Sequence, residues 1–150
     1  MKKHFITLFL ALILALTVVV PTASITLIDA VLDEALDKIA DDCVVFFVST
    51  DETYANRLCA HTITAGAGNG DFTAIADGPA GVGRALGLTA QIGISGTATG
   101  TAAYYGFATA GGGTPYYTNA LATTKAIVSG SSYDYDAMTY AIHFKDAVSE

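Results

Sequence analysis

The chain of 150 residues has no tryptophan, two cysteines, three prolines and only seven lysines and arginines against fourteen acidic residues. Nucleic-acid binding needs a basic surface that neutralises phosphates, and a formal net charge of −7 argues against one. The two cysteines have no further cysteine or histidine close enough to complete four zinc ligands. We therefore expect no nucleic-acid partner, no metal site and no cofactor.

Candidate catalytic groups are equally scarce. Cys59 and His61 would share one face of a strand, but no third group is placed to orient them as a catalytic pair requires. The glycine-rich segments 65–71 and 78–83 lack the residues of phosphate-binding loops, so we interpret them as turns. An oxygen-ligand calcium site in the segment 131–137 is conceivable, although a polar hairpin turn is the simpler interpretation. The residues therefore predict that the protein is not an enzyme.

The N-terminus has the layout of a secretory signal peptide. Residues 1–4 are basic, residues 5–20 carry no charge, and residues 21–24 are small or helix-breaking. We expect residues 1–24 to be a hydrophobic leader that is cleaved after Ser24. A retained membrane anchor and a misassigned start codon, in which case the leader is never made, are the alternatives.

Export would permit a disulfide between Cys43 and Cys59, whose spacing suits two neighbouring strands joined by a loop. The simpler interpretation is that both are small buried residues of a reduced protein.

Residues 25–41 predict the one clear helix. Its apolar stripe repeats at steps of three and four residues and includes Val31, Leu32 and Leu36. Acidic residues occupy the other side, which is most simply a solvated face.

After residue 42 the periodicity changes to that of strands separated by glycine-rich turns. The expected strands cover 43–50, 57–64, 71–77, 84–95, 97–109, 116–123, 124–130 and 138–145. The first is a continuous apolar run, typical of a strand buried on both faces. This spacing predicts a mainly β protein, with a single β-sandwich or jelly-roll-like domain over residues 25–150 that includes the helix at its N-terminus.

Alternation along two strands predicts which side chains point into the core. In the segment 84–95, Leu86, Leu88, Ala90, Ile92 and Ile94 are expected on one side. In the last strand, Tyr140, Ile142 and Phe144 are expected in the core, with His143 and Lys145 facing out.

Three stretches carry a resemblance to a known family: "ASITLIDAVLDEALDKIADD" (23–42), "GRALGLTAQIGISGTATGTAAYYGFAT" (83–109) and "ALATTKAIVSGSSYDYDAMTYAIHFKDAVSE" (120–150). Together they resemble small virion structural proteins of tailed bacteriophages, over roughly residues 23–150. The shared features are the opening helix, a Gly-Arg pair leading into a strand, a "GTAT" segment before an aromatic strand, and an alternating final strand. The hydrophobic leader and the two cysteines depart from that pattern.

The resemblance implies a non-enzymatic particle component, such as a capsid decoration protein or a part of the neck or tail. It implies location in the virion, with other virion proteins or copies of the chain itself as partners, in an oligomer, and with no membrane for the mature domain. The alternative is a secreted or cell-surface β-sandwich, either adhesin-like or a filament subunit in which residues 5–40 form a long packing helix.

Two neutral segments are the expected contact surface, because they could bury surface area against another chain without burying unpaired charged groups. They are the helical stripe with Val31, Leu32 and Leu36, and the small-residue segment of Thr97, Ala98 and Thr99. The alternative left open is that the sheet packs on the helix of its own chain.

Overall fold

The computed structural model describes residues 21–145, and the side chains from Asp29 onward. Most of the expected leader, residues 1–20, lies outside the described residues. Helix α2 (Pro21–Asp42) confirms the helix predicted at 25–41 and includes the last four residues assigned to the leader. No helix in the described range combines the length and the hydropathy needed to cross a membrane.

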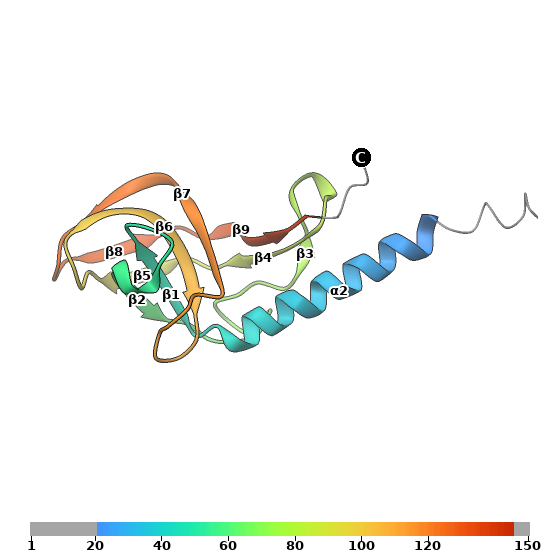
Figure 1. The fold of residues 1–150 in the computed structure, drawn as a ribbon, viewed down its shortest axis with the longest axis horizontal. Coiled ribbons are helices and arrows are strands. Elements are labelled where there is room, and N and C mark those ends of the chain that lie inside the picture. The colour runs from blue at the N-terminus through green and yellow to red at the C-terminus, as the bar shows by residue number, and fades with distance from the viewer. Residues whose placement is uncertain (1–20, 146–150) are drawn as a thin grey trace, which may run out of the picture.

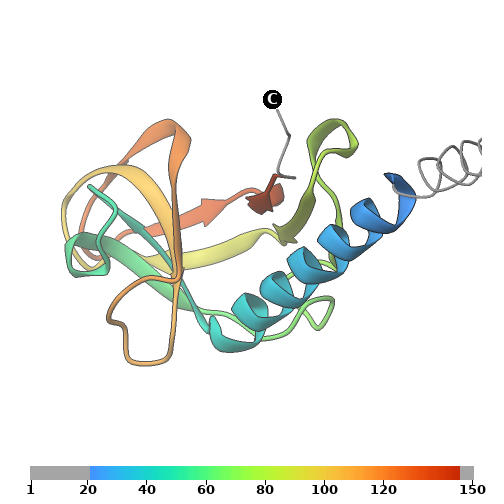
Figure 2. The ribbon, with the colours of Figure 1, turned by 45° about the vertical axis from the view of Figure 1, so that its right-hand side comes forward.

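Apart from two short 3-10 helices, Tyr54–Asn56 and Pro79–Gly81, the regular structure after α2 in the described residues is antiparallel β-structure, which confirms the predicted mainly β class. The strands are β1 (Val45–Ser49), β2 (Arg57–Thr62), β3 (Ala76–Asp77), β4 (Arg84–Leu88), β5 (Gln91–Ser95), β6 (Gly100–Ala108), β7 (Tyr117–Ile127), β8 (Ser132–Tyr135) and β9 (Met138–Phe144). They form a four-stranded sheet in the order β2-β1-β6-β7, a three-stranded sheet β3-β4-β9 and a pair β5-β8. Helix α2 lies along one side of this β body, and its N-terminal end projects beyond it (Figures 1 and 2).

Strand β1 is the centre of the core, as its apolar run predicts. It pairs with β2 on one side and β6 on the other. Phe46, Phe47 and Val48 are completely buried. Since consecutive side chains of a strand point to opposite faces, burial of all three shows that both faces of the sheet are covered here.

The segment 84–95 is not one strand. The expected common face is right for Leu86, Leu88 and Ile94, which are buried, and wrong for Ala90 and Ile92, which are exposed. Strand β4 ends at Leu88 and β5 begins at Gln91, and β5 bulges because Ile92 and Gly93 together oppose Asp134 alone. The carboxylate of Asp134 accepts a hydrogen bond from the Gly93 amide at 2.8 Å, and Gly93 has a φ of +73°. Ile92 is consequently 72% exposed.

The predicted register of the last strand is right for Ile142, which is completely buried, and wrong for Tyr140, which is 45% exposed. Leu86 and Leu88 of β4 pair with Ile142 and Met138, so the three residues 139–141 oppose Gly87 alone. This bulge breaks the alternation, and Ala141 is buried instead of Tyr140.

Beyond the bulge, Phe144 is half-buried against the core. His143, which was expected to face out, is half-buried outside the core. The Nε2–H of His143 donates to the carbonyl of Val82 at 2.9 Å, which holds the ring against the turn before β4.

Other differences are in strand length. The expected strand 71–77 shortens to β3 and one isolated bridge at Phe72, and the strand expected from 97 begins at Gly100. The segments 116–123 and 124–130 join into the single strand β7, whose middle is displaced by a bulge described below.

Candidate functional site

The expected helical contact stripe is divided between the core and the surface. Leu36 is completely buried in the core of its own chain, Leu32 is half-buried, and Val31 is 61% exposed. Ala40, one turn after Leu36, is also completely buried. The β body therefore covers the C-terminal half of α2 and leaves the side that carries Val31 uncovered.

The expected small-residue contact segment makes internal contacts. The amides of Thr97 and Ala98 both donate to the carbonyl of Leu58, at 2.8 and 3.1 Å. The hydroxyl of Thr99 accepts a hydrogen bond from the Ser129 amide at 3.1 Å. Ala98 is half-buried against the core, so a bulky residue there would disturb the fold as well as any contact.

Cys43 and Cys59 are both free and buried. Cys59 pairs across the sheet with Val48, five residues beyond Cys43 in the chain, which places the cysteines roughly 16 Å apart. A disulfide needs Cα atoms within about 7 Å, so the described fold does not accommodate this bond.

Burial also removes the cysteines as nucleophiles. Burial raises the pKa of the Cys43 thiol to about 12, and it raises the pKa of Cys59, whose sulfur lies 3.8 Å from the hydroxyl of Tyr135. Both thiols therefore stay protonated at neutral pH, and a thiolate is the reactive form of cysteine.

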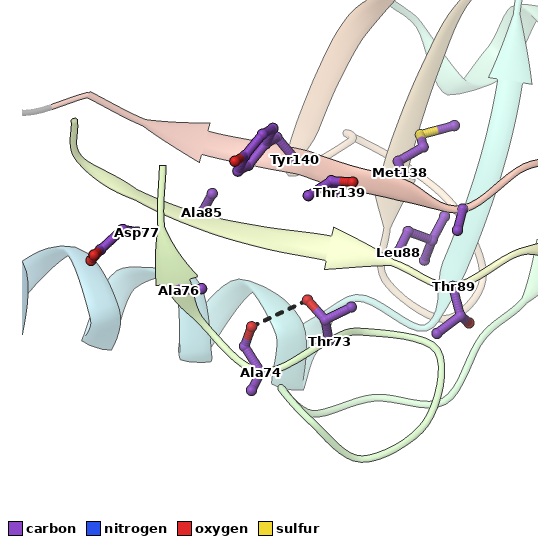
Figure 3. Close-up of a pocket in the computed structure, with 11 residues that line it drawn as sticks. Thr73, Ala74, Ala76, Asp77, Ala85, Leu88, Thr89, Met138, Thr139 and Tyr140 are labelled. Atoms are coloured by element: carbon purple, nitrogen blue, oxygen red, sulfur yellow. Dashed lines mark hydrogen bonds between the residues drawn. The ribbon is translucent and has the colours of Figure 1, made fainter. Parts of the chain in front are cut away.

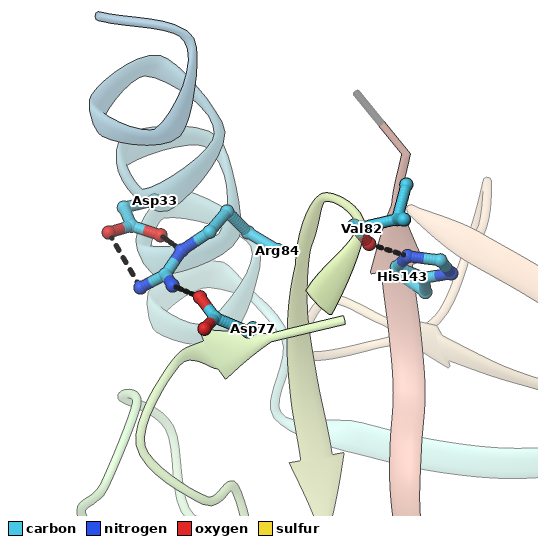
Figure 4. Close-up of polar contacts among 5 residues, drawn as sticks. All are labelled: Asp33, Asp77, Val82, Arg84 and His143. Carbon is cyan, nitrogen blue, oxygen red and sulfur yellow. Dashed lines mark hydrogen bonds and ion pairs between the residues drawn. The ribbon is translucent and has the colours of Figure 1, made fainter. Parts of the chain in front are cut away.

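Arg57 and Arg84 are the two arginines of the chain, and both make contacts within it. Arg57 stacks over the ring of Tyr54 at 4.3 Å and donates to the Tyr54 carbonyl, which braces the turn before β2. Arg84, at the start of β4, forms ion pairs with Asp33 of α2 and with Asp77 of β3 (Figure 4).

Two adjoining grooves form the candidate site. The first, with a volume of about 560 Å³, lies between β9 and the β3–β4 region. Figure 3 shows Met138, Thr139 and Tyr140 on β9 at its upper side, with Ala85 and Leu88 of β4 beneath them. The second, of about 400 Å³, lies on the other side of Met138 and Tyr140, against β7.

The wall of the second groove is a bulge in β7. Ala102 and Tyr104 of β6 pair with Lys125 and Ala120, so the four residues 121–124 oppose Ala103 alone. Of these four, only Leu121 packs on the core, and the other three are exposed. The bulges of β7 and β9 therefore face each other across this groove.

The hydroxyl of Tyr105 closes the floor between the bulges. It donates to the carbonyl of Ala141 at 2.7 Å, and its side chain is buried. This bond joins the four-stranded sheet to β9, so the two walls of the second groove are held relative to each other.

The grooves suit contact with another protein better than they suit chemistry. Their lining is mostly methyl groups and threonine hydroxyls, and the only charged residues in it are Asp77, which pairs with Arg84, and Asp136. Among residues 21–145 no group of three histidine, cysteine or acidic side chains is placed to hold a metal ion. We name the surface formed by Tyr140, Met138 and residues 120–123 the groove surface.

Sequence reasoning did not identify the groove surface. Alternation assigned Tyr140 to the core, and residues 121–124 were predicted to be ordinary strand.

No protein-family model, curated protein or solved structure matches this chain.

Proposed function

We propose that this chain is a non-enzymatic structural subunit of a tailed-phage particle, a capsid decoration protein or a component of the neck or tail, which acts through protein–protein contacts. The observation that carries the proposal is the groove surface, where a large aromatic side chain and small neutral residues are exposed side by side. Contiguous exposed apolar surface, unlike single exposed apolar residues, is typical of contact sites. The resemblance of residues 23–150 to virion proteins supports the particle context.

Strand edges support the same proposal. β7 and β9 are each the last strand of their sheet. The outer backbone groups of such strands are available to a strand from another chain. The side chain of Asn119 already accepts a bond from the Ala120 amide, at 2.9 Å, so the residues 121–124 are the more open part of the β7 edge.

The test is the association state of the full-length chain and of an Ala122→Arg variant. Ala122 is exposed in the β7 bulge and lines the second groove. We expect light scattering after size exclusion to show an oligomer for the wild-type chain. For Ala122→Arg we expect the dissociation constant to rise at least about tenfold, because a cation would be buried without a partner.

Thr62→Arg is the matched control, because Thr62 is an exposed residue of β2, in the same sheet but at its opposite edge. It adds the same charge and should associate as the wild type does. A wild-type chain that stays monomeric and joins no particle, or equal weakening by both variants, would refute the contact surface.

One observation favours a second candidate, a secreted or cell-surface filament subunit. Helix α2 projects beyond the β body, and Val31 on it is 61% exposed, as expected of a helix that packs in a filament (Figure 1). A mature N-terminus at Ile25 in a secreted fraction would favour this candidate, and an N-terminus near Ala23 without export would favour the virion protein.

A further inference from the structure

We propose that Arg84 is an electrostatic latch that fixes the direction in which helix α2 projects from the β body. The inference does not depend on which partner the protein binds, since it concerns only contacts within the chain.

The latch is a bidentate ion pair between the helix and a strand. The Nε of Arg84 lies 2.6 Å from one carboxylate oxygen of Asp33, and an Nη lies 3.1 Å from the other. The second Nη donates to Asp77 of β3 (Figure 4). Two parallel bonds between a guanidinium and a carboxylate fix orientation as well as distance, which a single contact does not.

Among residues 29–42, whose side chains the structure describes, the apolar contacts of the helix gather near its C-terminal end. The completely buried helical side chains of this range, Leu36 and Ala40, lie one turn apart, and Ile39 beside them packs on the core. They span about 6 Å of a helix that is about 33 Å long. Asp33 lies almost one turn before Leu36, and ahead of it Ala30 and Val31 are exposed. Without the ion pair, the helix could rotate relative to the β body about the contact made by Leu36 and Ala40, and its N-terminal end would move the most.

The strand end that holds Arg84 is itself firmly placed. The amide of Gly78 donates to the carbonyl of Gly83 at 2.9 Å, which closes the turn between β3 and β4. His143 of β9 binds the Val82 carbonyl in the same turn. Gly83 has a φ of +71°, and a Cβ there would overlap the carbonyl oxygen of Phe144. The Gly83-Arg84 pair thus combines a turn that only glycine fits with the cation that holds the helix.

In the described part of the chain, Arg84 is the one cation that both carboxylates of the latch, Asp33 and Asp77, bind. It gathers two carboxylates, one from α2 and one from β3, around one cation whose side chain is only 17% exposed. If the cation were removed, Asp33 and Asp77 would repel each other across the same gap. The helix would then be pushed from its position as well as released.

The test measures helix direction by electron paramagnetic resonance. Spin labels are attached at Val31→Cys on α2 and Ser95→Cys on β5, both exposed positions, while the native cysteines are buried. The full-length labelled chain is diluted in unlabelled chain, so that only distances within one molecule contribute. Asp33→Asn removes the latch carboxylate, and Asp37→Asn makes the same change one turn away at an exposed position.

We expect one narrow distance distribution for the parent and for Asp37→Asn, and a distribution at least about twice as wide for Asp33→Asn, with the β-sheet circular dichroism signal unchanged. An unchanged narrow distribution in Asp33→Asn would overturn the proposal, since apolar packing alone would then set the helix direction. Loss of the β-sheet signal in Asp33→Asn would also overturn it, because the ion pair would then hold the fold rather than the helix direction.

Discussion

Replacing Phe107 with alanine is expected to lower the free energy of unfolding by about 3–5 kcal/mol, the usual cost of emptying a fully buried aromatic site. Phe107 is completely buried in β6. Its ring lies 5.2–6.5 Å, centre to centre, from four other rings, those of Phe46, Phe72, Tyr105 and Tyr117. These come from four different segments, so the cavity could not be filled by one small shift. Urea denaturation followed by circular dichroism measures the loss.

Tyr140→Ala is the matched control, because sequence alternation assigned Tyr140 to the core as well. It is 45% exposed on the groove surface, so its loss should cost less than about 1 kcal/mol. Comparable losses for the two variants would mean that the bulge in β9 is wrong and that Tyr140 lies in the core.

The second large effect is expected from Gly83→Ala. A side chain at a φ of +71° costs about 1–2 kcal/mol, and the new methyl group would also overlap the backbone of Phe144. Relieving that overlap requires β4 and β9 to separate, which adds about 1–3 kcal/mol. We expect a total loss of about 2–5 kcal/mol in the free energy of unfolding.

Gly81→Ala separates the cost of the positive φ from the cost of the overlap with Phe144. Gly81 lies in the same turn with a φ of +73°, but no atom lies within 4 Å of the position of an added Cβ. It should lose only the conformational part, about 1–2 kcal/mol. If thermal or urea unfolding gave the same loss for both glycines, close approach of Phe144 would have no role at this turn.

Local patterns predicted the elements well. The continuous apolar run of residues 43–50 gave a central strand, and the apolar repeat of 25–41 gave the helix. Both signals depend on side chains within one segment. For the same reason the turns at 65–71 and 78–83 could be recognised from their glycines.

The errors in side-chain register coincide with bulges, which depend on residues far apart in the sequence. Nothing within residues 138–144 indicates that three of them oppose Gly87. An added Cβ at Gly87 would lie 2.8 Å from the Thr73 hydroxyl and 3.0 Å from the Met138 and Thr139 carbonyls. The bulge thus depends on a close approach of three chain segments. The groove surface is made by two such bulges, so the hydrophobic periodicity of single segments could not predict it.

The ion pair of Arg84 could not be predicted from the sequence for the same reason, because its partner is far away in the chain. The residues next to Arg84 in the sequence do not indicate which carboxylate it pairs with. Its bidentate partner, Asp33, precedes it by 51 residues and lies on the polar face of the helix. Only the packing of α2 against β4 identifies which of the several helical carboxylates it meets.

The proposed function requires this chain to be a multi-copy part of a particle. The direct measurement is quantitative mass spectrometry of particles purified from a culture that produces the chain, with the copy number taken relative to the major capsid protein. We expect a fixed ratio corresponding to several copies per particle, which persists through density-gradient purification. A chain that is absent from the particles and is recovered instead in the soluble secreted fraction would contradict the claim.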